Sequence, residues 1–164
     1  MQKISFEQVS LGSDTFDALS DDATEQMIAL FGKEQPYIID YLVASFEEDL
    51  DDEQHEDLFY LGIRLWAAIR QIYPDIPTIS ESDILEAETA NEQMLTYLAD
   101  ENEEGLENFA QILLEDYKQS DLLQYVVMVI EQPDENGREL DQETHGAFFI
   151  TLKTLIDCLE KVLP

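Results

Sequence analysis

The chain contains two histidines, and each stands in the same short pattern of residues that could do chemistry. The pattern is L-D-x-E-x-H. In both copies the Asp and the His are four residues apart, as Asp51 with His55 and as Asp141 with His145. Residues at this spacing share one face of a helix, where a carboxylate and an imidazole can converge on a metal ion. One interpretation is therefore a metal-binding protein.

Helix capping explains the same letters without a metal. An Asp just before a helix accepts hydrogen bonds from first-turn amides, and a Glu in that turn favours the helix dipole. The spacing also departs from the ferritin-type centre, which needs Glu-x-x-His, because this chain has Asp52-x-x-His55 and Gln142-x-x-His145. We favour capping, since cap signatures are common and metal ligands must converge from several elements.

Patterns of nucleophilic or phosphate-binding sites are missing from the sequence. It has no Gly-rich phosphate loop, no cysteine cluster of the zinc type and no nucleophile elbow. The single Cys158 lies in an apolar helical run, which predicts a small core residue in a reducing compartment. We expect a protein that is not an enzyme and that uses no cofactor.

The charge is the most unusual property of the chain. There are 38 Asp and Glu residues against 8 Lys and Arg residues, and the formal net charge is -30. A surface of this sign repels nucleic acid phosphates and anionic lipid headgroups, and it accelerates encounter with basic proteins. Direct nucleic acid or membrane binding is therefore disfavoured, and a basic protein partner is expected. The plainer alternative is a solvated surface that only confers solubility.

Two clusters of carboxylates form the predicted interaction surface. The denser cluster, at residues 47–53, lacks the turn glycine and the closing glutamate of an EF-hand, so it predicts only weak, nonspecific cation binding. The residues expected to contact a partner are Glu47, Glu48, Asp49, Asp52, Glu53, Asp100, Glu101, Glu103 and Glu104.

Hydrophobic periodicity predicts one all-α domain over residues 1–164, a compact bundle or short helical repeat of about seven helices. Residues 1–19 carry Gly12 and scattered Ser and Asp, and we expect an irregular arm docked on the body. The run YVVMVI is also typical of a strand, but its neighbours favour a helix. The predicted helices cover residues 20–31, 36–46, 52–73, 82–99, 103–117, 120–130 and 141–162.

Comparison of the chain with itself predicts an internal repeat. The two L-D-x-E-x-H patterns continue in register through Leu65 with Leu155, and upstream Gln35 aligns with Gln119. Amphipathic helices always match at apolar positions, so only the polar identities support a duplication. The predicted repeats are residues 20–73 and 103–163, with the helix at 82–99 as a linker.

These patterns favour a non-enzymatic, acidic protein–protein interaction module. One alternative is a nucleic-acid-mimicking inhibitor or immunity-type protein, whose carboxylates stand in for phosphates. Another is a metal-binding protein that uses His55 and His145 with nearby carboxylates. Uninterrupted apolar runs of about 18 residues are missing, and the first residues do not resemble a signal peptide, so we expect a cytoplasmic protein. The sequence leaves its oligomeric state open.

Overall fold

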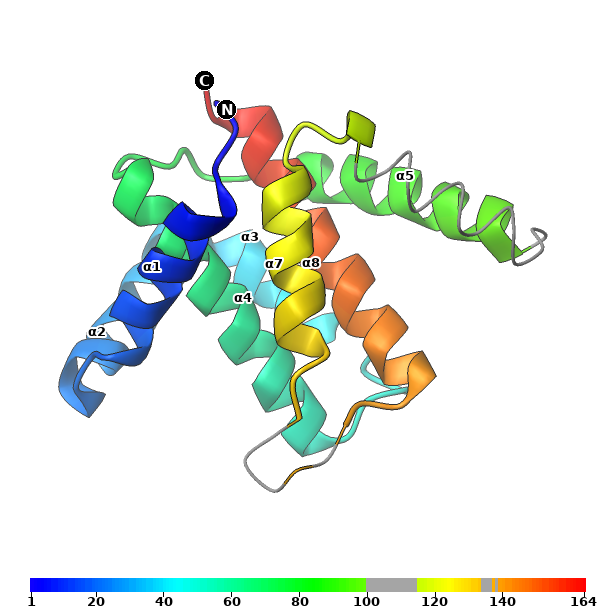
Figure 1. Cartoon of the computed structure of the whole chain (residues 1–164), viewed down its shortest axis with the longest axis horizontal. Helices are drawn as coiled ribbons and strands as arrows, with labels where there is room; N and C mark the ends of the chain where they lie inside the picture. Colours follow the sequence, from blue (N-terminus) through cyan, green and yellow to red (C-terminus); the bar gives the residue numbers. More distant parts are fainter. Residues whose placement is uncertain (100–114, 134–136, 138) are drawn as a thin grey trace.

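The computed structural model describes residues 1–99, 115–133, 137 and 139–164. Its described residues form a compact all-α domain without strands, which confirms the predicted fold class (Figure 1). The predicted helix at 103–117 lies mostly outside the described residues. The helices are α1 (Phe6–Asp17), α2 (Asp21–Glu34), α3 (Pro36–Ala44), α4 (Asp52–Ile72), α5 (Glu81–Ala99), α7 (Ser120–Ile130) and α8 (Gln142–Val162).

Helix α4 is the centre of the fold, as its apolar residues predict. Trp66, Leu58 and Ile69 are completely buried, and α1, α3 and α8 all pack against the helix. The ring centroids of Phe31 on α2 and Trp66 lie 4.8 Å apart, so α2 packs against the same core. None of the described helices is long and apolar enough to cross a membrane.

The prediction of an irregular arm over residues 1–19 is wrong, because Phe6–Asp17 form helix α1. Ser5 and Gln8 make a reciprocal capping box at its start. Gly12, which suggested a loop, faces α4 instead: a β-carbon at this position would lie 2.8 Å from the Cα atom of Ala68. The glycine therefore permits a close approach of two helices, a requirement that depends on the tertiary structure.

Two buried glutamines, at the N-terminal ends of α3 and α7, hydrogen-bond to extended segments of the chain. The Gln35 side chain accepts a hydrogen bond from the amide of Ile79 at 2.9 Å and donates to the carbonyl of Pro77 at 2.9 Å. Gln119 does the same for the N-terminal segment: it accepts from the amide of Ile4 and donates to the carbonyl of Gln2, both at 3.1 Å. Both glutamine side chains are fully removed from solvent.

The helices that follow these two segments begin alike. Ser5 caps α1 together with Gln8, and Ser80 exchanges equivalent hydrogen bonds with Asp83 at the start of α5. Likewise α4 and α8 each have 21 residues and an Asp N-cap. Helices α1 and α5 therefore start with the same kind of reciprocal cap, and the linker role predicted for residues 82–99 stays a prediction. The duplication itself stays a prediction.

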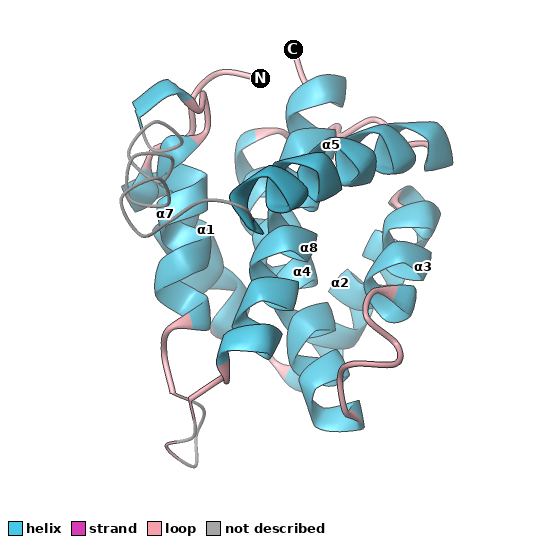
Figure 2. Cartoon of the chain, turned by 90° about the vertical axis from the view of Figure 1, so that its right-hand side faces the viewer, coloured by secondary structure: helices cyan, strands magenta, loops and turns pink. Residues whose placement is uncertain are grey.

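Helix α5 lies across α8 and is held there by a buried polar network (Figure 2). Lys153 on α8 is 6% exposed, and its ammonium donates to Asn91 Oδ1 and Asp157 Oδ2, each at 2.8 Å. Asn91 in turn donates to the hydroxyl oxygen of Thr154 at 2.9 Å. Burial, with Asp157 next to it, raises the pKa of Tyr117, so this hydroxyl stays protonated and donates to Asp157. Each polar group in the network therefore has a partner.

We expect Asp83→Asn to reduce the part of the free energy of unfolding that is lost as the pH falls into the acid range. Hydrogen bonds from the Ser80 hydroxyl, then from Lys161, lower the pKa of Asp83 from 3.8 to about 2. A carboxyl whose pKa is lower in the folded chain stabilises the fold above its unfolded pKa, and this stabilisation disappears as the pH falls through the folded value. Asp83→Asn should therefore be less stable at neutral pH, and its deficit should shrink as the pH falls from about 4 to about 2.

Urea unfolding followed by the fluorescence of Trp66, the only tryptophan, measures this difference. Other carboxyl groups titrate in the same range, so the result lies in the difference between the two pH curves rather than in either one alone. A deficit that stays constant from neutral pH to pH about 2 would show that the ionisation of Asp83 contributes nothing.

Candidate functional site

One end of the molecule gathers carboxylates, where α4 and α8 begin and where the chain leaves α3 and α7. We call it the acidic pole and define it as residues 45–57, 131–133 and 139–145. These residues include no Lys or Arg, and Arg138 in the neighbouring loop lies outside the described residues. The carboxylates of the pole are Glu47, Glu48, Asp49, Asp51, Asp52, Glu53, Glu56, Asp57, Glu131, Glu139, Asp141 and Glu143.

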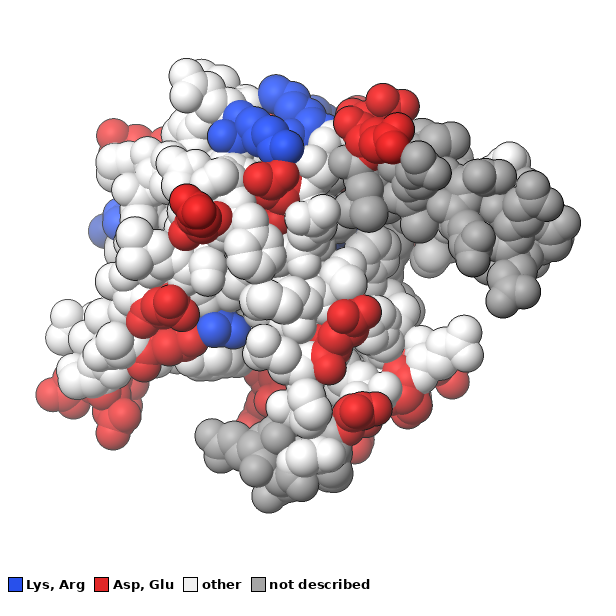
Figure 3. Space-filling view, viewed as in Figure 1, with Lys and Arg blue, Asp and Glu red and all other residues white. Residues whose placement is uncertain are grey.

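The cations of the described residues are largely paired elsewhere. On the face shown in Figure 3, the largest group of blue atoms lies near the upper edge, and the described residues near the lower edge show red atoms without blue ones. These cations cannot neutralise the acidic pole, because they are held by other carboxylates. The pairs are Lys3 with Asp121, Arg64 with Asp17, Arg70 with Glu34, Lys118 with Glu160, Lys153 with Asp157, and Lys161 with Asp83 and Glu86.

Both aspartates of the repeated pattern cap helices, as the capping interpretation predicts. Asp51 accepts a hydrogen bond from the amide of Gln54 at 2.9 Å, and Asp141 accepts one from the amide of Thr144 at 2.8 Å. The hydrogen bonds from the Thr144 amide and hydroxyl lower the pKa of Asp141 below its ordinary value. The first turns of α4 and α8 also touch, since Gln54 Nε2 donates to Thr144 Oγ1 at 3.2 Å.

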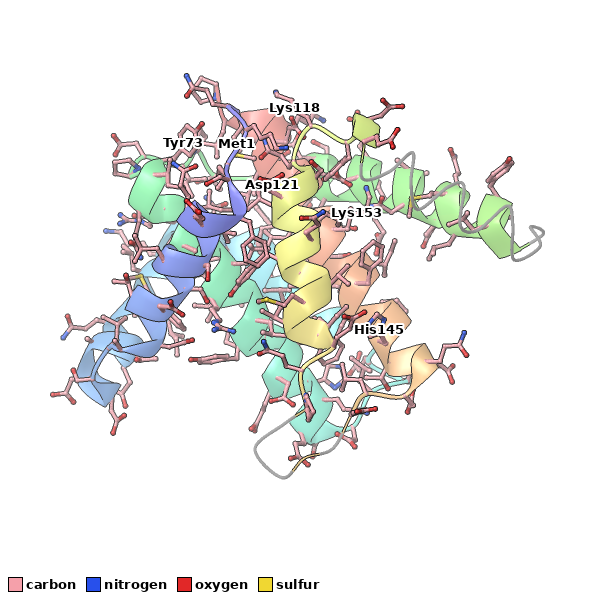
Figure 4. The ribbon with its side chains drawn as sticks, in the orientation of Figure 1. Met1, Tyr73, Lys118, Asp121, His145 and Lys153 are labelled. Atoms are coloured by element: carbon pink, nitrogen blue, oxygen red, sulfur yellow. The ribbon has the colours of Figure 1, made fainter. Side chains whose placement is uncertain are left out.

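The two histidines lie in these same first turns. The ring nitrogens of His55 lie 3.1 Å from the carbonyl oxygen of Asp51 and 3.3 Å from that of Ser45. His145 is half-buried near the start of α8 (Figure 4). Across the described residues, no group of three or more His, Cys, Asp and Glu side chains is placed to hold a metal ion.

A groove of about 440 Å³ opens between the start of α4, the end of α7 and the start of α8. We call it the central groove. Asp51 and Asp141 both line it, so the structure brings these two predicted residues together. Its carboxylates surround an apolar floor in which Phe148 and Ile130 are buried. The lining residues are Asp51, Glu53, Gln54, Asp57, Tyr60, Leu61, Val129, Ile130, Gln132, Pro133, Glu139, Leu140, Asp141 and Phe148.

A second, more open groove of about 640 Å³ lies on the other side of α4. We call it the side groove. Val43 is 59% exposed here, an unusual position for an apolar side chain beside so many charges. His55 lines this groove and not the central one, so the structure separates it from Asp141. The lining residues are Val43, Glu47, Leu50, Asp52, His55, Glu56 and Phe59.

The structure distributes the predicted interaction residues over both grooves. Glu53 lines the central groove, whereas Glu47 and Asp52 line the side groove. Glu48 and Asp49 lie exposed in the turn between α3 and α4, which follows Phe46 with its left-handed backbone (φ 56°). The other predicted residues, Asp100, Glu101, Glu103 and Glu104, lie outside the described residues.

Comparisons with protein-family models, curated proteins and solved structures find no match, so the function has to be argued from the chain itself.

The single cysteine offers no nucleophile. Cys158 is completely buried, and its Sγ atom donates to the carbonyl oxygen of Asp83 at 3.7 Å. Burial raises the pKa of the Cys158 thiol to about 12, so it carries almost no thiolate at neutral pH. A small buried core residue is what the apolar helical run predicts.

Sequence reasoning named Asp141 only as a helix cap or a candidate metal ligand and did not place any residue of α7, or Glu139, in an interaction site. Glu139 and Asp141 join Glu53 at the central groove, although they lie far away in the chain. The repeated L-D-x-E-x-H pattern was the signal that could have placed them together, because it predicts equivalent starts for α4 and α8. The floor residue Val129 gives no such signal, since helical periodicity assigns it to a core.

Proposed function

We propose that this chain is a non-enzymatic interaction module whose acidic pole binds a basic partner protein. The observation that supports the proposal is the combination found at one end of the fold. Exposed carboxylates surround grooves whose floors are apolar, and the residues of the pole include no Lys or Arg. A purely solubilising surface needs only the charges, whereas a binding surface needs apolar contact area as well.

The negative charge of the pole should increase the association rate of basic partners and discriminate against anionic ones. Long-range attraction raises the association rate of a basic protein and repels nucleic acid phosphates. The apolar floors then provide the short-range contact that keeps the complex together. Binding should weaken steeply as salt rises, because exposed charges farther apart than about 10 Å are screened at about 0.1 M ionic strength.

Capture from a lysate of the host at low salt tests the proposal with three forms of the chain. The first is wild type. The pole variant carries Glu47→Gln, Glu48→Gln, Asp49→Asn, Asp52→Asn and Glu53→Gln. The control variant carries Asp14→Asn, Asp21→Asn, Asp22→Asn, Glu25→Gln and Glu92→Gln, all at exposed positions of α1, α2 and α5.

The control is matched to the pole variant in two respects. Each variant removes five carboxylates, which changes the formal net charge from -30 to -25. Each also removes two first-turn carboxylates, Asp52 and Glu53 on α4 against Asp21 and Asp22 on α2, so the helix dipoles lose equal support. Asp51 is kept in both because it caps α4.

The proposal expects one basic protein to be retained by wild type and by the control variant, and released by a salt step. Its recovery on the pole variant should fall at least about tenfold, and mass spectrometry of the eluates measures this. Equal recovery on all three forms, or equal loss on both variants, would show that the pole has no special role and that only net charge matters.

A further inference from the structure

The central groove has a counterpart on the other side of the contact between α4 and α8. Helix α4 follows Leu50 and Asp51 as α8 follows Leu140 and Asp141, and the two first turns touch. The correspondence relates the central groove to a small cavity of about 60 Å³, which the turn before α4 and the start of α8 form. That cavity is lined by Phe46, Asp49, Leu50, Glu143, Thr144 and Ala147.

The two sites differ in volume and lining. Ile130 in the central groove corresponds to the larger Phe46 in the small cavity, and Asp57 corresponds to Ala147. The central groove measures about 440 Å³ and the small cavity about 60 Å³, so the two corresponding sites have not kept the same space for a ligand.

The floor and the rim of the central groove differ in chemistry. Leu61, Val129 and Leu140 are half-buried and form the apolar floor together with Phe148. Such a floor makes favourable contact only with an apolar group. The rim carries five carboxylates, Asp51, Glu53, Asp57, Glu139 and Asp141. A ligand that satisfies both parts is apolar at its centre and positively charged on both sides.

We infer that the central groove binds a basic linear segment of the partner, with one leucine-sized side chain on the floor and Arg or Lys side chains at the rim. The inference rests on the proposed function and specifies its ligand. The volume suits it, because sites that enclose a ligand usually range from about 300 to 1,000 Å³. A bare metal ion would leave the floor unused, and a nucleic acid would be repelled by the rim.

Fluorescence anisotropy with two labelled peptides at low salt tests this inference. One peptide has a single leucine between two pairs of arginines, and the other has serine in place of the leucine. Wild type should bind the leucine peptide about tenfold more tightly, since only leucine can bury apolar surface on the floor. Val129→Phe, which places a larger side chain in the lining of the groove, should abolish this preference and leave the affinity for the serine peptide nearly unchanged.

A matched pair of variants tests the rim. Glu139→Gln removes an exposed carboxylate from the central groove, and Glu25→Gln removes an exposed carboxylate from α2, outside the acidic pole. Both variants have the same net charge. Glu139→Gln should weaken the leucine peptide about threefold, whereas Glu25→Gln should leave its affinity within the error of measurement.

The outcomes separate this inference from the proposed function. Equal, salt-sensitive binding of both peptides would overturn the groove inference and leave recognition of a basic partner standing. A leucine preference that survives Val129→Phe would also overturn it, because the leucine would then lie elsewhere. Failure of both peptides to bind at low salt would count against the groove and the proposed function together.

Discussion

Replacement of Lys153 with methionine should lower the free energy of unfolding by about 3 kcal/mol. The Lys153 ammonium is almost completely buried between α8 and α5, where Asn91 and Asp157 accept its hydrogen bonds. Methionine fills a similar volume but leaves the Asp157 carboxylate without its counter-ion. The side chain of Asp157 is 23% exposed, so partial hydration limits the loss to the lower end of the range for buried pairs. Urea unfolding followed by Trp66 fluorescence measures the change.

Two further variants separate burial from pairing. Lys118→Met also removes one lysine that is paired with a carboxylate, Glu160 at 3.0 Å, but Lys118 is 57% exposed, so its loss should destabilise the fold far less than the loss of Lys153. Lys153→Met combined with Asp157→Asn removes the stranded charge and should be more stable than Lys153→Met alone. If Lys153→Met costs no more than Lys118→Met, the network does not hold α5 in place.

The sequence predicts most of the helices because their signals are local. The caps at Asp51 and Asp141 and the apolar residues around Trp66 lie within a few turns of the helix they define. Helix α1 was missed although Ser5 and Gln8 carry the local pattern of a capping box, because two residues inside the helix pointed away from it. Gly12 alone indicates a loop, and its close contact with Ala68 is visible only in the structure. The sequence likewise assigns Ser13 to the surface, because the hydrogen bond that Tyr125 donates to this buried side chain joins two distant helices.

The candidate site was predicted in part for the same reason. The carboxylates at 47–53 are neighbours in the chain, so their clustering is visible in the sequence. Their meeting with Glu139 and Asp141 depends on the contact between Gln54 and Thr144, which no local pattern specifies. Likewise, a lysine such as Lys153 in an apolar helix gives no hint that its partner Asn91 lies on another helix.

Gln119→Met and Gln35→Met should each destabilise the fold by about 2 kcal/mol. Methionine matches the volume of glutamine, so the loss comes from hydrogen bonds rather than from a cavity. In Gln119→Met the amide of Ile4, a residue that is 1% exposed, loses its acceptor, and a buried unpaired donor costs about 1–3 kcal/mol. In Gln35→Met the amide of Ile79 loses its acceptor in the same way, and Ile79 is also completely buried.

The comparison between these variants tests whether the two glutamines contribute equally to the free energy of unfolding. Gln26→Met is the control, because Gln26 is exposed on α2 and its replacement should change stability by less than about 0.5 kcal/mol. Equal losses in Gln35→Met and Gln119→Met, against none in Gln26→Met, would show that each extended segment is anchored through one buried amide. This would also give the predicted duplication a polar, energetically measurable feature in both halves. A loss confined to one of the two would mean that the matching hydrogen bonds contribute unequally to the free energy of unfolding. The predicted repeat would then be supported by the sequence pattern alone.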